Sequence, residues 1–142
     1  MDRRTARTLI ERLNRDAEQI ARHFGLQYKS ITAERTNVRS RYGICYDDGT
    51  IKIRLRHAVT REPLKYSSLV NTLCHELAHL RHFHHGERFK DFYLQLLAYA
   101  RAQRLYRPGP DRRPGPAPGY TQARPPLREE AEPRRPIQLG LF

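Results

Sequence analysis

The sequence has few cysteines and no long apolar run. Its only cysteines, Cys45 and Cys74, form no C-x-x-C pair, which argues against a disulfide framework and against a cysteine zinc site. No apolar stretch approaches the ~18 residues of a membrane span. The N-terminus begins with the charged residues Asp2, Arg3 and Arg4 and lacks a hydrophobic signal region. We therefore expect a cytoplasmic protein, without a membrane partner, whose two thiols are buried.

Acidic residues are also scarce. Lys and Arg number 27 against 15 Asp and Glu, which gives a net charge of +12. The tail from residue 107 carries seven Arg and four acids, so nine of these positive charges belong to the preceding segment. A field of this size attracts phosphate backbones and predicts nonspecific DNA binding and association with the nucleoid. The alternative is a codon bias toward Arg and ordinary solvated helix faces.

The first half of the chain predicts one helix followed by strands. A length of 142 residues suits one small domain. Apolar residues spaced by three and four indicate an amphipathic helix that ends at Gly25. Strands are expected over 27–33 and 38–46, and a turn then leads into a strand near Leu55 with one apolar and one basic face.

The second half predicts two helices, which makes the fold α+β. Pro63 opens a segment that Ser67 or Ser68 is expected to cap, with an apolar helix over about 65–84. A final amphipathic helix follows. Its apolar residues are Phe89, Phe92, Tyr93, Leu96, Leu97 and Ala100.

One helix contains the motif H-E-x-x-H, formed by His75, Glu76 and His79. Residues four apart share a helix face, so the two imidazoles can bind one metal ion while Glu76 is angled toward its water. Zinc accepts neutral imidazole, and a neighbouring carboxylate can act as general base and then general acid. A chance match on a polar helix surface is the alternative. The apolar neighbours argue against it, because unpaired His and Glu are costly to bury.

A third ligand must come from farther along the chain, because a straight helix cannot surround a tetrahedral site. Gly86 indicates that the helix ends or bends nearby, and a residue beside it can turn back onto the metal. Spacing alone leaves the choice open. The candidates are His82, His84, His85, Glu87 and Asp91.

Four blocks of sequence resemble the YgjP-like and SprT-like zinc metallopeptidases. They are S-R-Y-G-I-C at 40–45, D-G-T-I-K-I-R-L at 48–55, L-C-H-E-L-A-H at 73–79 and H-H-G-E-R-F at 84–89. The resemblance covers roughly residues 5 to 105.

The resemblance implies a zincin-like metallopeptidase domain over 1–106, with an N-terminal helix, antiparallel strands, the H-E-x-x-H helix and a C-terminal helix. It implies that Zn²⁺ is held by His75, His79 and His85, and that Glu76 is catalytic. In peptidases of this architecture an edge strand can hold an extended peptide substrate. The hairpin ending near Leu55 is our candidate for that strand.

The composition changes after Arg104. Nine of the ten prolines fall between 108 and 136, which predicts a disordered linker over 107–136. Apolar residues return at 137–142, and the last five residues resemble the Q-L-x-L-F peptide that binds the bacterial sliding clamp. A few anchors on a disordered peptide suit a weak contact. The expected anchors are Gln138, Leu139, Leu141 and Phe142.

Two functions therefore compete. The first is a zinc-dependent protease tethered to the sliding clamp, which cuts proteins bound or crosslinked to DNA. The second is a noncatalytic adaptor in which zinc only stabilises a DNA-binding or clamp-binding module. Glu76 favours the protease, since an adaptor does not need a general base.

Overall fold

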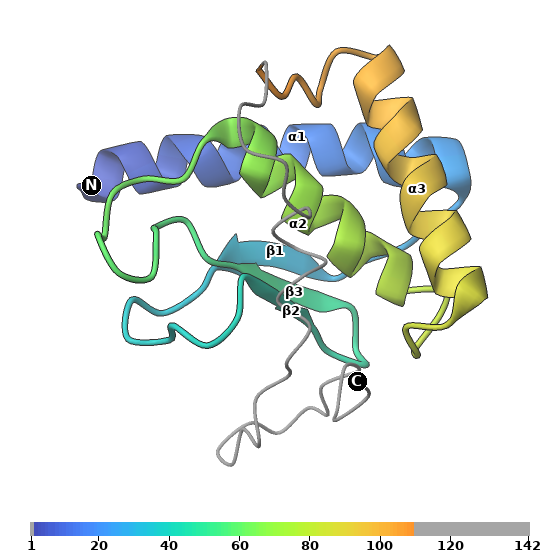
Figure 1. Cartoon of the computed structure of the whole chain (residues 1–142), viewed down its shortest axis with the longest axis horizontal. Helices are drawn as coiled ribbons and strands as arrows, with labels where there is room; N and C mark the ends of the chain where they lie inside the picture. The colour runs from blue at the N-terminus through green and yellow to red at the C-terminus, as the bar shows by residue number, and fades with distance from the viewer. Residues whose placement is uncertain (1, 110–142) are drawn as a thin grey trace.

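The computed structural model describes residues 2–109 and has the α+β fold that the sequence predicts (Figure 1). Three helices lie on one side of a small sheet. Gly25 ends the first helix with a left-handed backbone, φ 71°, as expected. The predicted linker beyond residue 109 and the peptide at 137–142 lie outside the described residues. The elements are α1 (Arg3–Phe24), β1 (Ser30–Ala33), β2 (Gly43–Cys45), β3 (Thr50–Ile53), α2 (Tyr66–His79) and α3 (Glu87–Ala102).

The sheet has the strand order β1-β3-β2. β2 and β3 form the predicted antiparallel hairpin, in which Ile44 pairs with Lys52. β1 joins the other edge of β3 in parallel, with Ile31 opposite Ile51. The expected antiparallel arrangement therefore holds for β2 and β3 but not for β1, because β1 and β3 lie some twenty residues apart and no hairpin turn joins them.

The strands are shorter than expected. β1 begins at Ser30 and β2 has three residues, because the segment between them forms a loop. The buried carboxylate of Glu34 accepts hydrogen bonds from Arg41 Nε at 2.9 Å and Nη2 at 2.6 Å. This ion pair ties the two ends of the loop together instead of extending the strands.

The predicted basic face of the last strand is partly wrong, because Arg54 is buried. Its guanidinium donates hydrogen bonds to the carbonyl oxygens of Arg39, Arg41 and Arg56 and lies 4.4 Å from the centre of the Tyr42 ring. Burial lowers the pKa of Arg54. The three carbonyls offset the loss of water, so Arg54 joins neighbouring loops instead of facing solvent.

Helix α2, which carries the H-E-x-x-H motif, differs from its prediction at both ends. Lys65 precedes the first turn of α2 and no side chain caps it, so the expected cap at Ser67 or Ser68 is wrong. The helix ends at His79 instead of near residue 84, since the amide of Leu80 turns back to bond the carbonyl of Leu77. α3 begins directly after Gly86. The early end of α2 leaves a short loop next to the H-E-x-x-H motif.

The core lies between the helices and the upper face of the sheet, and α2 runs through its middle. Both cysteines are free and buried, as expected. Burial raises the pKa of the Cys45 thiol, and the charge of Glu76 adds to that effect. Burial also raises the pKa of Cys74, so both are neutral thiols. None of the helices within residues 2–109 has the length and apolar character needed to cross a bilayer.

Candidate metal centre

α2 places the H-E-x-x-H motif inside the protein. The exposed fractions of His75, Glu76 and His79 are 2%, 2% and 0%. These residues occupy the last turns of a helix whose other faces pack on the core. Two imidazoles and one carboxylate are therefore held in low-dielectric surroundings, where an uncompensated charge is costly.

His85 returns from the loop after α2 to complete a three-histidine cluster. Its Nε2 atom lies 2.9 Å from His79 Nε2 and 3.1 Å from His75 Nε2. These three residues form the group of possible metal ligands found within the described chain. The other candidates from the sequence, His82, His84, Glu87 and Asp91, are not in this group.

The donor set fits zinc. Zn–N bonds of 2.0–2.1 Å in tetrahedral geometry imply ligand nitrogens about 3.3 Å apart, close to the two spacings found here. The Nδ1–H of His79 donates to the carbonyl oxygen of His82 at 3.1 Å, which leaves the lone pair of His79 on Nε2, toward the cluster. The role of the His82 carbonyl was not predicted, because a backbone oxygen leaves no mark in a sequence.

Burial keeps the imidazoles of His79 and His85 neutral. It lowers the pKa of His79 to about 3, and the neighbouring His85 adds to this shift. Burial and then the nearby His84 lower the pKa of His85 to about 4. Neutral imidazole is the form that binds a metal ion, so the cluster is ready for one at physiological pH.

Glu76 lies against β2 at Gly43. A Cβ atom built on Gly43 would lie 3.1 Å from Glu76 Oε2, 2.8 Å from Thr72 Cγ2 and 3.1 Å from the carbonyl oxygen of Lys52. Position 43 therefore has room only for glycine. The sequence places Gly43 within a family block but gives no sign of this contact.

The hairpin beside the site has its open edge at β2. β3 is the central strand, so the strand that ends near Leu55 does not itself form an edge. β2 is the edge strand of the predicted hairpin and packs on α2. The edge next to Glu76 is therefore the one at Gly43–Cys45.

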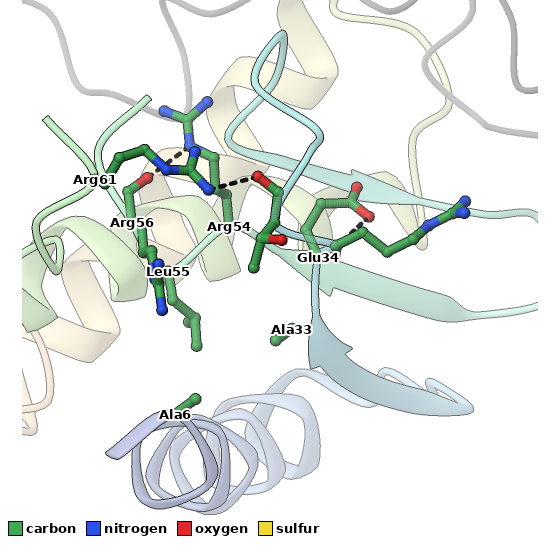
Figure 2. A pocket seen from close by; sticks show the side chains of 9 residues that line it. Ala6, Ala33, Glu34, Arg54, Leu55, Arg56 and Arg61 are labelled. Carbon is green, nitrogen blue, oxygen red and sulfur yellow. Dashed lines mark hydrogen bonds between the residues drawn. The ribbon is translucent and has the colours of Figure 1, made fainter. Parts of the chain in front are cut away.

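A separate pocket lies at the carboxyl ends of β1 and β3, beside the first turns of α1 (Figure 2). Its floor is apolar and consists of Ala6, Ala33 and Leu55. Arginines line the walls, and Arg61, whose φ is +66°, donates to the carbonyl oxygen of Thr36 at 2.7 Å. The lining arginines are Arg35, Arg54, Arg56 and Arg61.

The sequence of residues 2–113 matches the family model described as WLM domain. The chain belongs to the WLM family. This is a family of zinc metalloproteases, and the clustered histidines suit that membership. The match is consistent with the SprT-like resemblance and adds nothing specific to the YgjP-like family. None of the curated proteins matches the sequence significantly.

Two solved structures support the same fold. The crystal structure of Wss1 from Saccharomyces cerevisiae is similar to this WLM domain with a TM-score of 0.65 and 18% identity, over 72% of this chain and 84% of that one. Wss1 from S. pombe gives a TM-score of 0.59 and 25% identity, over 70% of this chain and 86% of that one. At 18% identity, the similarity to Wss1 from Saccharomyces cerevisiae shows a shared fold.

Proposed function

We propose that this WLM domain is a zinc-dependent peptidase that hydrolyses proteins associated with DNA. The convergence of His75, His79 and His85 nitrogens at the end of the helix that also carries the buried Glu76 supports the proposal most directly. In the proposed site the three histidines hold Zn²⁺ and Glu76 is the catalytic acid and base. An extended substrate pairs with the edge of β2.

Each residue has a defined task in hydrolysis. Zinc, when bound, supplies Lewis acidity that lowers the pKa of a water in its coordination sphere toward about 7. Glu76 takes a proton from the attacking water on a carboxylate oxygen and later gives it to the leaving amine. The buried surroundings strengthen the attraction between the Glu76 carboxylate and the positive charges that develop near it, because water does not screen them. Glu76 thus begins and ends the cycle as a carboxylate.

The proposal is tested by comparing Glu76→Gln with Glu87→Gln on a protein substrate bound to DNA. Glu87 is an exposed acid in the first turn of α3 and serves as the matched control. We expect Glu76→Gln to bind one zinc ion and lose turnover by about 10²-fold or more, while Glu87→Gln retains both. Equal cleavage by Glu76→Gln and wild type would refute the catalytic role.

The positive charge of the domain supports the DNA part of the proposal. The pocket of Figure 2 concentrates four arginines, and its acidic lining residue, Glu34, is paired with Arg41. Arg54 and Arg61 brace the loops around it. We infer that the phosphates of bound DNA lie along this arginine-lined pocket, to which Arg35 and Arg56 contribute.

The double variant Arg35→Gln/Arg56→Gln tests this surface. A control with the same loss of charge is Arg22→Gln/Arg101→Gln, which changes exposed arginines of the last turns of α1 and α3. We expect only the pocket variant to reduce the slope of log affinity against log salt, by about 0.7 per lost phosphate contact on single-stranded DNA. Equal slopes for both variants would mean that DNA binds at another surface of the domain.

A noncatalytic adaptor is the alternative function. In that case zinc would only stabilise the fold, and Glu76→Gln would be as active as wild type in every DNA-dependent assay. The buried Glu76, next to His75 on α2, favours the peptidase, because an adaptor does not need a general base near its zinc ion.

We further propose that residues 137–142 tether the peptidase to the sliding clamp of a replicative polymerase. These residues lie outside the described part of the chain, so the proposal is based on their sequence alone. Leu139, Leu141 and Phe142 would fill an apolar cleft and Gln138 would bond its rim. Association with the nucleoid follows from the same proposal.

A further inference from the structure

One aromatic residue contacts all three histidines of the cluster. The ring of Phe89, in the first turn of α3, lies with its centre 5.0 Å from that of His75, 4.5 Å from His79 and 4.7 Å from His85. It stacks on His79 at an interplanar angle of 27° and meets the other two at 71° and 76°. Phe89 is fully buried, so it forms an apolar platform on one side of the cluster.

The platform is itself held in place. Tyr93, one turn farther along α3, lies parallel to Phe89 with an interplanar angle of 5° and ring centres 6.1 Å apart. The Tyr93 hydroxyl donates a hydrogen bond to the side-chain oxygen of Asn71, one turn before His75 on α2. Tyr93 and Asn71 are 3% and 2% exposed. The two helices are therefore joined by a buried polar contact beside the three histidines.

We propose that Phe89 is a positioning residue that fixes the orientation of the three imidazoles for metal binding. This inference rests on the proposed zinc site. Rotation of a histidine ring about its Cβ–Cγ bond is soft, whereas a functional site needs its groups held within roughly 10–20°. A flat ring against three imidazoles restricts all of them at once. It also offers no lone pair, so neither water nor metal gains a partner on that side.

The test compares Phe89→Leu with Phe92→Leu. Both substitutions shorten a buried Phe of α3, but Phe92 packs on Phe24 and on the ring of His82 instead of on the cluster. The measurements are the zinc dissociation constant, from competition with a chromophoric chelator, and the visible absorption spectrum of the cobalt-loaded protein. Circular dichroism of each variant checks that the fold is present.

We expect Phe89→Leu to weaken zinc binding by about 10- to 100-fold, as loss of a group that orients ligands does, and to alter the cobalt spectrum. Phe92→Leu is expected to keep both at wild-type values even where its melting temperature falls. If Phe89→Leu does not fold, Phe89→Met, with a long flexible apolar side chain, takes its place with the same expectation.

Wild-type affinity and spectrum in the folded Phe89 variant would overturn this inference while leaving the zinc site intact. An equal loss in Phe92→Leu would also overturn it, because the effect would then be one of general packing. Failure of the wild-type protein to bind zinc would overturn the proposed function as well. The readouts do not depend on peptidase activity, so the two failures are distinguishable.

Discussion

Gly43 and Glu76 are in contact across the β2–α2 interface, and a single added carbon on Gly43 would lie 3.1 Å from Glu76 Oε2. The same carbon would lie 2.8 Å from Thr72 Cγ2, a spacing that forces one of the groups to move. A glycine in the edge strand thus sets where the proposed catalytic carboxylate lies.

Gly43→Ala is expected to reduce turnover by about 10²-fold, because displacements near 1 Å at a reacting group have effects of this size. Zinc stoichiometry should remain at wild type, since the three atoms nearest to the added carbon belong to Thr72, Glu76 and Lys52 and not to the histidines. Gly86→Ala is the control, because a Cβ atom at Gly86 meets nothing within 4 Å. Kinetics and metal analysis of both variants check the prediction. Unchanged turnover in Gly43→Ala would mean that β2 adjusts without moving Glu76.

Metal loading should stabilise the wild-type domain and not the His79→Ala variant. A ligand that binds only the folded state adds about 4 kcal/mol when present at 1,000 times its dissociation constant. His82→Ala is the matched control, because His82 supplies a backbone carbonyl that the substitution preserves. Urea unfolding with zinc and with chelator measures the difference. Zinc stabilisation of His79→Ala equal to that of wild type would overturn the ligand assignment.

The metal-free domain should lose stability in weak acid because of its buried histidines. The pKa of His79 falls from its ordinary value of 6.5 to about 3 on folding, so the unfolded chain binds the proton more tightly. This contribution to stability is fully present above pH 6.5 and is lost as the pH falls toward 3. Over this range the free energy of unfolding, measured at a series of pH values, should fall more steeply with decreasing pH for wild type than for His79→Gln. Equal slopes would contradict the prediction.

Glu34→Gln should destabilise the domain by about 3–5 kcal/mol, the usual result of leaving one partner of a buried ion pair uncompensated. The Glu34 and Arg41 side chains are 0% and 4% exposed. The exposed pair of Arg22 and Glu18, at 76% and 65%, is the control, and Glu18→Gln should cost less than about 1 kcal/mol. Equal losses of unfolding free energy in urea for the two variants would show that burial does not determine how much an ion pair contributes to stability.

Deletion of Gln138–Phe142 should abolish capture of the domain by an immobilised sliding clamp while peptidase activity on a soluble substrate stays at wild type. The physical reason is that the apolar anchors are confined to these residues of the tail. A chain with the same five residues in shuffled order is the control for length and composition. Continued capture of the truncated chain would assign the clamp contact to another segment.

The element types followed from local pattern, but their ends did not. Apolar spacing predicted α1, α3 and the β2–β3 hairpin, because amphipathic faces repeat along the chain. The strand and helix ends depend on contacts between distant residues. The Glu34–Arg41 pair confines β1 and β2, and the turn at Leu80 ends α2 early. The local secondary-structure propensity of the sequence predicts neither this ion pair nor this turn.

The sequence by itself determined the chemistry, since H-E-x-x-H spacing places His75, His79 and Glu76 on one helix by geometry alone. Only the tertiary structure decided what surrounds them. It brought His85, which spacing alone left among five candidates and the family resemblance implied, against His75 and His79. It also placed Gly43 against Glu76 and Phe89 against the three imidazoles. These contacts join a loop, a strand and a second helix. Side chains that meet across elements depend on how the elements pack, which no local pattern encodes.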